Sequence, residues 1–119
     1  MYFSHVAAMA AVGCWPFFCH ADVAPAIDAG RTLYQSVCRG CHGPENVMVS
    51  APKAGDLAEW EQRLSRGSRG LETLADNAVN GFGAMPAKGG RSELSRDQIL
   101  QAVRFMMQPR ASSDAATLR

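Results

Sequence analysis

The sequence has 119 residues, which is the usual size of one domain. Lys and Arg number 12 and Asp and Glu number 11, so the formal net charge is only +1. This balance argues against nucleic acid or an anionic membrane as the main partner, because both are bound through an excess of positive charge. We therefore expect a single folded unit with no nucleic-acid partner.

The first 21 residues differ from the rest because they contain no Asp, Glu, Lys or Arg. Their apolar run, residues 6–18, is shorter than the ~20 residues that a membrane-spanning helix needs. The segment ends in the small residue Ala21, which is typical of an export cleavage site. We therefore expect a cleaved signal peptide over residues 1–21 and a periplasmic location, with an uncleaved N-terminal anchor or a lipidated Cys14 as the alternatives. Residues 22–109 would then form the domain and residues 110–119 a flexible tail.

The sequence contains four cysteines, of which Cys14 and Cys19 lie in the segment that we expect to be removed. The other two occur in the motif Cys-Arg-Gly-Cys-His at residues 38–42, which is the attachment pattern of c-type haem. Two thiols at this spacing can add to neighbouring vinyl groups of a porphyrin, and the adjoining imidazole then lies under the iron. The motif therefore predicts one covalent haem c, held by Cys38, Cys41 and His42.

A Cys-x-x-Cys pair alone also occurs in dithiol redox sites and in zinc sites. A zinc site needs further ligands, but residues 22–119 contain no other cysteine and no histidine besides His42. A thioredoxin-like pair follows a strand, whereas the residues before Cys38 have helical periodicity. The wider pair, Cys14 and Cys19 followed by His20, lies in the expected signal peptide. Haem attachment is therefore the preferred interpretation.

The first helix of the domain is predicted over residues 26–37, where apolar or small residues recur at helical spacing: Gly30, Leu33, Tyr34, Val37 and Cys38. Glycine inside a helix costs up to ~1 kcal/mol relative to alanine, which a close crossing by another helix would explain. The expected partner is a C-terminal helix over residues 96–107, predicted to start with a capping box formed by Ser95 and Gln98.

Two shorter helices are predicted between these. One covers residues 57–66, with Asp56 as its N-cap and Glu59 completing a capping box. The other covers residues 71–80, with Gly81 after its end and an apolar stripe that reaches Phe82. No segment alternates like a strand, so we expect an all-α domain of about four helices wrapped around one covalently bound haem, with its N- and C-terminal helices crossing.

The sixth ligand of the iron is predicted to be Met85. This residue lies in a Gly/Pro-rich stretch, residues 81–90, where small residues let the backbone approach a flat cofactor and Pro86 keeps Met85 extended. Met106 and Met107 lie on a helix stripe and are interpreted as core residues, and Met48 is the reserve ligand. His/Met ligation fills both axial positions and raises the reduction potential, so it favours electron transfer over catalysis.

These motifs resemble class I cytochrome c, and more narrowly the bacterial cytochrome c-five family. The resemblance covers about residues 26–107 and includes Ala51-Pro52-Lys53, Trp60 and residues 83–90. It implies the small class I cytochrome c fold, a hydrogen bond from His42 to the carbonyl of Pro52, and a position for Trp60 beside the haem near a propionate. Some members carry a further cysteine pair where this chain has residues 91–94, so that disulfide is absent here.

The expected function is therefore single-electron transfer between redox proteins outside the cytoplasm, with partners such as membrane respiratory complexes and no enzymatic activity of its own. One alternative is an electron-accepting cytochrome subunit of a dehydrogenase or oxidase complex. Another is a haem gas sensor or a peroxidase-like catalyst, which requires an open sixth position. We also expect a cationic rim for docking, formed by the four cations that flank the two loops: Arg39, Lys53, Lys88 and Arg91.

Overall fold

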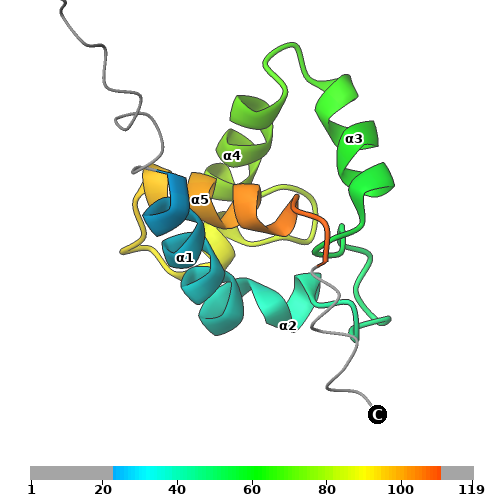
Figure 1. Ribbon diagram of the computed structural model, residues 1–119. Coiled ribbons are helices and arrows are strands. Elements are labelled where there is room, and N and C mark those ends of the chain that lie inside the picture. The colour runs from blue at the N-terminus through cyan, green and yellow to red at the C-terminus, as the bar shows by residue number, and fades with distance from the viewer. Residues whose placement is uncertain (1–22, 111–119) are drawn as a thin grey trace, which may run out of the picture.

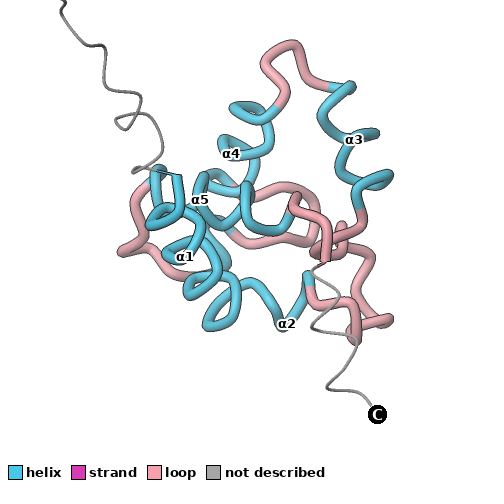
Figure 2. The backbone as a smooth tube through the Cα atoms, viewed as in Figure 1, coloured by secondary structure: helices cyan, strands magenta, loops and turns pink. Residues whose placement is uncertain are grey.

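The computed structural model describes residues 23–110, so the expected signal peptide and most of the expected tail lie outside the described residues. The chain forms α1 (Val23–Leu33), a π-helical turn (Tyr34–Cys38), α2 (Arg39–His42), α3 (Leu57–Arg66), α4 (Leu71–Asn80), a 3-10 turn (Ala87–Gly90) and α5 (Arg96–Met106). The helices and their connecting loops are shown in Figures 1 and 2. Residues 23–110 include no strand, and Phe82 and Met85 form only an isolated bridge. The predicted all-α fold is confirmed.

Helices α1 and α5 cross and pack against each other, as Figure 1 shows. Gly30 is buried at the crossing, where an added Cβ would overlap the backbone carbonyl of Gln101 and lie 3.2 Å from the Cβ of Phe105. The ring of Phe105 in turn lies 5.3 Å from that of Tyr34 and 5.6 Å from the Arg31 guanidinium. The glycine on the stripe of α1 therefore allows the close approach of α5 that its position predicts.

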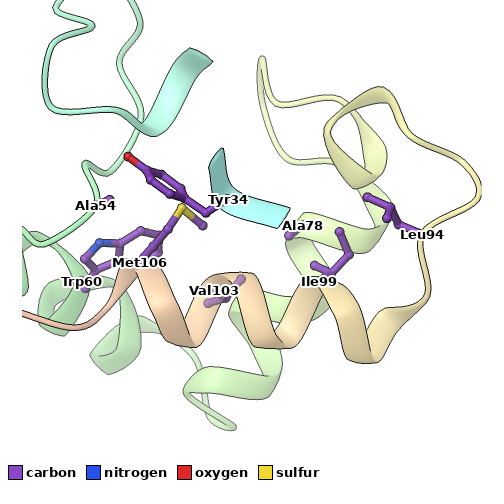
Figure 3. Packing of buried hydrophobic residues seen from close by; sticks show 8 residues of the cluster. All are labelled: Tyr34, Ala54, Trp60, Ala78, Leu94, Ile99, Val103 and Met106. Carbon is purple, nitrogen blue, oxygen red and sulfur yellow. The ribbon is translucent and has the colours of Figure 1, made fainter. Parts of the chain in front are cut away.

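The apolar stripe of α5 forms the centre of the core. Figure 3 shows Ile99, Val103 and Met106 along one face of α5, with Tyr34 and Trp60 near Met106. Met106 is buried and Met107 packs against the same cluster, which confirms that both are core residues. Phe82 does not continue the stripe of α4 as expected. Gly81 ends α4 at φ 85° and turns the chain, which leaves Phe82 69% exposed.

The capping predictions are confirmed for α5 and half confirmed for α3. Ser95 and Gln98 bond each other's backbone amides, so the box of α5 is complete. At α3, the Asp56 side chain accepts from the amide of Glu59. The Glu59 side chain does not return the bond, because the Asp56 amide already donates to the carbonyl of Lys53. Instead Glu59 Oε2 accepts from the amide of Lys53 and Oε1 forms an ion pair with Arg63.

The first helix differs from the expected residues 26–37, because it runs on through a π turn into α2 and ends only at His42. The π turn is closed by the Arg39 amide, which donates to the carbonyl of Tyr34, five residues earlier. Within this region the Ser36 hydroxyl donates hydrogen bonds to the carbonyls of Thr32 and Leu33, so it competes with backbone amides for these acceptors. The wider turn rotates the Cys-x-x-Cys-His motif relative to the buried stripe of α1.

Candidate haem-binding site

His42 lies at the end of α2 and is only 6% exposed. Its Nδ1 is 2.8 Å from the carbonyl oxygen of Pro52, and its own carbonyl accepts from the amide of Ala54, also at 2.8 Å. Because a carbonyl can only accept, Nδ1 carries the proton and Nε2 keeps its lone pair. The hydrogen bond between His42 and Pro52 is therefore the one that the resemblance implies, and it leaves the lone pair of Nε2 available to a metal.

The protonation of His42 also suits a ligand. Burial lowers the pKa of the imidazole below its ordinary value, and the nearby Lys53 and Arg63 cations lower it further, whereas the hydrogen bond to Pro52 opposes them. The neutral ring, which is the form that binds iron, is therefore the dominant one at neutral pH.

Cys38 lies at the end of the π turn and Cys41 in α2, and both thiols are free. Cys38 is half-buried, and this burial, with a smaller contribution from the charge of Cys41, raises its pKa to about 11. Cys41 is exposed. The two thiols flank a helical turn that ends at His42, so two sulfurs and one imidazole lie on five consecutive residues.

Trp60 packs on the side of His42. The indole and imidazole rings are stacked with centroids 6.3 Å apart and an interplanar angle of 23°. Trp60 is 4% exposed, and its indole N–H donates to the carbonyl of Lys53 at 2.9 Å. Since this N–H is already used within the protein, any contact of Trp60 with a haem propionate would not involve its hydrogen-bond donor.

Met85 lies in a tight loop after α4. Phe82 and Met85 exchange backbone hydrogen bonds of 3.1 and 3.0 Å, and Gly81 and Gly83 adopt positive φ angles of 85° and 58° that other residues rarely adopt. Met85 is half-buried and packs against the hydrophobic core, whereas Met48 is 90% exposed. The structure therefore gives Met85, rather than the reserve Met48, the ordered setting that a ligand needs.

The donors present fit a covalently bound haem. Two uncombined thiols, an imidazole whose Nε2 is available and a thioether in a separate loop match what haem c requires. Within residues 23–110 no three or more His, Cys, Asp or Glu side chains are grouped so that they could hold a metal ion. No helix in this part of the chain has the length and apolar character to cross a bilayer.

Comparison with known proteins decides the family. The profile of the family described as "Cytochrome C oxidase, cbb3-type, subunit III" matches residues 25–106. The chain belongs to the class I c-type cytochromes. It is 37% identical to cytochrome c-555 of Chlorobaculum tepidum over 83 residues, which cover 66% of this chain and 72% of the relative. It is 36% identical to cytochrome c5 of Ectopseudomonas mendocina over 69 residues, covering 58% of this chain and 76% of the relative.

A solved structure gives the same result for the fold. A chain in the crystal structure of an electron transfer complex of nitrite reductase with cytochrome c superposes with a TM-score of 0.56 at 35% identity, covering 66% of this cytochrome and 90% of that chain. This cytochrome thus carries one covalent haem c and acts as an electron carrier, not as an enzyme. The resemblance to the cytochrome c-five family is confirmed.

Of the predicted site residues, the structure places Pro52 and Trp60 beside the His42 ring, and Met85 lies in the loop after α4. The roles of Lys53 and Glu59 there could not be predicted from sequence motifs, because both side chains bind backbone groups whose positions are set by the folded loop. Two of the four cations in the predicted rim form ion pairs. Arg39 forms an ion pair with Glu45 at 2.7 Å and Arg91 one with Glu93 at 2.6 Å, so these two arginines add little net charge to a docking surface.

Proposed function

We propose that this cytochrome carries single electrons between redox proteins in the periplasm, with haem c attached through Cys38 and Cys41 and ligated by His42 and Met85. The observation that carries this proposal is the buried His42, which directly follows a pair of free thiols in the sequence and whose Nδ1 is held by the Pro52 carbonyl. The haem, when bound, supplies the one-electron couple.

Each residue then has a separate task. The sulfurs of Cys38 and Cys41 form the two thioethers, and the carbonyl of Pro52 fixes the plane and tautomer of His42. Met85 donates its thioether from the loop after α4, and a soft sulfur ligand favours the reduced state of iron. Trp60 closes the site on the His42 side and excludes water from the imidazole, since it is itself almost fully buried.

The partners are redox proteins, and we propose membrane respiratory complexes among them. The solved relative was crystallised in a complex with nitrite reductase, which supports a protein partner of this kind. Large apolar side chains are exposed in the loops that follow His42 and α4: Val47 at 85%, Met48 at 90% and Phe82 at 69%. Since the rim arginines are neutralised, we expect docking to depend more on these apolar groups than on charge.

The periplasmic location rests on the uncharged N-terminal segment, residues 1–21, which is typical of a cleaved export signal. The start of the proposed domain, residues 22–109, follows from that cleavage. Mass spectrometry of protein isolated from the periplasm tests both, because a mature chain starting at Asp22 is expected and a chain retaining residues 1–21 would instead indicate an anchor.

The second candidate function is that of a cytochrome subunit of an oxidase or dehydrogenase complex, and the description of the matching family, a subunit of an oxidase, favours it. Size-exclusion chromatography of detergent extracts separates the two. A carrier elutes as a small free protein, whereas a subunit co-elutes with a larger enzyme in a fixed ratio.

The attachment is tested with Cys38→Ala, Cys41→Ala and the double variant. Acidic acetone is expected to leave the pigment on the wild-type chain, because a thioether survives this treatment. The double variant is expected either to contain no pigment or to release it into the acetone as free haem. Pigment that leaves the wild-type chain as free haem would contradict the proposal.

A further inference from the structure

Lys53 lies between the two residues that hold His42. Pro52 accepts from the imidazole and Ala54 donates to the His42 carbonyl, so the backbone of residues 52–54 is clamped to His42 at both ends. The side chain of Lys53 adds a third tie, because its Nζ donates to the carbonyl of Cys41 at 2.9 Å and to that of Val49 at 2.8 Å. The half-buried Lys53 thereby joins the haem-attachment helix to the loop that follows it.

The backbone of Lys53 is also anchored on the opposite side, in α3. Its amide donates to Glu59 Oε2 at 3.2 Å and its carbonyl accepts from the Trp60 indole at 2.9 Å. A charged donor that bonds two carbonyls gives stronger bonds than a neutral one and holds the charge in one place. The cation is therefore held on the carbonyl of Cys41, the residue that directly precedes His42, and does not move freely in solvent.

We propose that Lys53 is a positioning residue for His42 and that its fixed ammonium raises the reduction potential of the bound haem. The inference rests on the proposed function, since it requires His42 to be an axial ligand. The reduced haem carries one positive charge fewer than the oxidised haem, so a nearby cation stabilises the reduced state relative to the oxidised one. The effect is larger at the edge of a protein interior than in water, because the effective dielectric constant is lower there.

Lys88, the other lysine of the sequence, serves as a comparison for Lys53. Lys88 Nζ donates to the carbonyl of Ser92, which lies in the loop before α5 and not in the segment that holds His42. Lys53 differs because both of its carbonyl partners belong to the segment that carries or follows the imidazole.

The test is the reduction potential of the holoprotein, measured by redox titration with mediators. Lys53→Met is expected to have a lower potential than the wild type, and Lys53→Arg, which keeps the charge, to recover most of the loss. Added salt should reduce the difference in reduction potential between Lys53→Met and the wild type, because counterions screen the partly exposed charge of Lys53. Arg104→Met, which removes a cation from the exposed face of α5, is the control for net charge and should shift the potential less.

A second measurement tests whether Lys53 positions His42. Hydrogen exchange of the Ala54 amide, which bonds the carbonyl of His42, should be faster in Lys53→Met and unchanged in Arg104→Met. If Lys53→Met does not take up haem, Lys53→Gln is measured instead, because it keeps a donor but has no charge. Potentials of the Lys53 and Arg104 variants that shift equally, in proteins with a normal haem spectrum, would overturn the inference. A wild-type chain without covalent haem would instead overturn the proposed function.

Discussion

The indole of Trp60 is stacked on the imidazole of His42, with centroids 6.3 Å apart, and the same indole donates its N–H to the carbonyl of Lys53. One side chain of α3 thus contacts both the proposed ligand and the segment that orients it. The position of the N-terminal end of α3 is in turn fixed by Asp56, which caps the helix, and by Glu59, which accepts a hydrogen bond from the amide of Lys53. The orientation of His42 therefore depends on a helix that starts 15 residues further along the chain, as the positions of His42 and Leu57 show.

Trp60→Phe keeps an aromatic ring beside His42 but removes the N–H. The Lys53 carbonyl then loses a hydrogen bond in a place where water has little access, so the free energy of unfolding should fall by about 1–3 kcal/mol. Urea denaturation of the holoprotein, followed by far-UV circular dichroism, measures this change. Unaltered stability would mean that the carbonyl of Lys53 is satisfied by its remaining bond from the Asp56 amide.

Gly30→Ala tests the crossing of α1 and α5. The added Cβ would overlap the Gln101 carbonyl, which is backbone and cannot move without shifting α5. Overpacking costs about 1–3 kcal/mol, which outweighs the gain of about 1 kcal/mol in helix propensity. The matched control is Ala29→Gln at the neighbouring, exposed position of α1, which enlarges a side chain on the solvent side of the same helix. Thermal unfolding should show a lower midpoint for the first variant and not for the second, and an equal response of both would contradict the close crossing.

Asp76→Asn tests the charged contact between α4 and α5. Asp76 bonds Arg96 at 2.8–2.9 Å and Arg69 at 2.8 Å, and the hydrogen bond and charge of Arg96, followed by those of Arg69, hold the pKa of the Asp76 carboxyl below its ordinary value of 3.8. A lowered pKa means that the folded state prefers the ionised carboxylate. The resulting stability is present above pH 3.8 and is lost as the pH falls through the folded-state pKa below that value.

We therefore expect Asp76→Asn to unfold at a lower temperature than the wild type at neutral pH, with the difference shrinking below pH 3.8. Glu61→Gln, which removes an exposed carboxylate from α3, serves as the control for net charge. A difference that stays constant from neutral to acid pH would exclude the ionised Asp76 as its source.

Met85→Ala should abolish the long-wavelength absorption band that oxidised haem shows when methionine sulfur is bound to iron, and it should lower the reduction potential, since the soft ligand is lost. Met48→Ala should change neither, because Met48 is 90% exposed. Carbon monoxide binding to the reduced protein provides the second measurement, as an open sixth position admits the gas in the Met85 variant only. A wild-type protein that binds carbon monoxide readily would favour the gas-sensor or peroxidase alternative.

Most of the helices could be predicted from local sequence. The bounds of α3 and α4 agree with the predicted residues 57–66 and 71–80, because caps such as Asp56 and the glycine after Asn80 act within one turn of the residues that they terminate. The π turn before Cys38 was not predictable in this way. This turn depends on which group donates hydrogen bonds to the carbonyls of Thr32 and Leu33, and the hydrophobic periodicity of the sequence does not show that.

The sequence by itself determined the kind of site, because thioether attachment and the first iron ligand require residues at fixed spacing within five positions, and residues 38–42 have that spacing. The tertiary structure decided what surrounds it. The partners of Glu59 and Lys53, the neutralisation of Arg39 and Arg91 and the different exposures of Met48 and Met85 all depend on contacts made after the helices have packed. Side chains pair with the donors, acceptors and charges that folding brings close to them. The order of residues along the chain does not specify the distances between these groups.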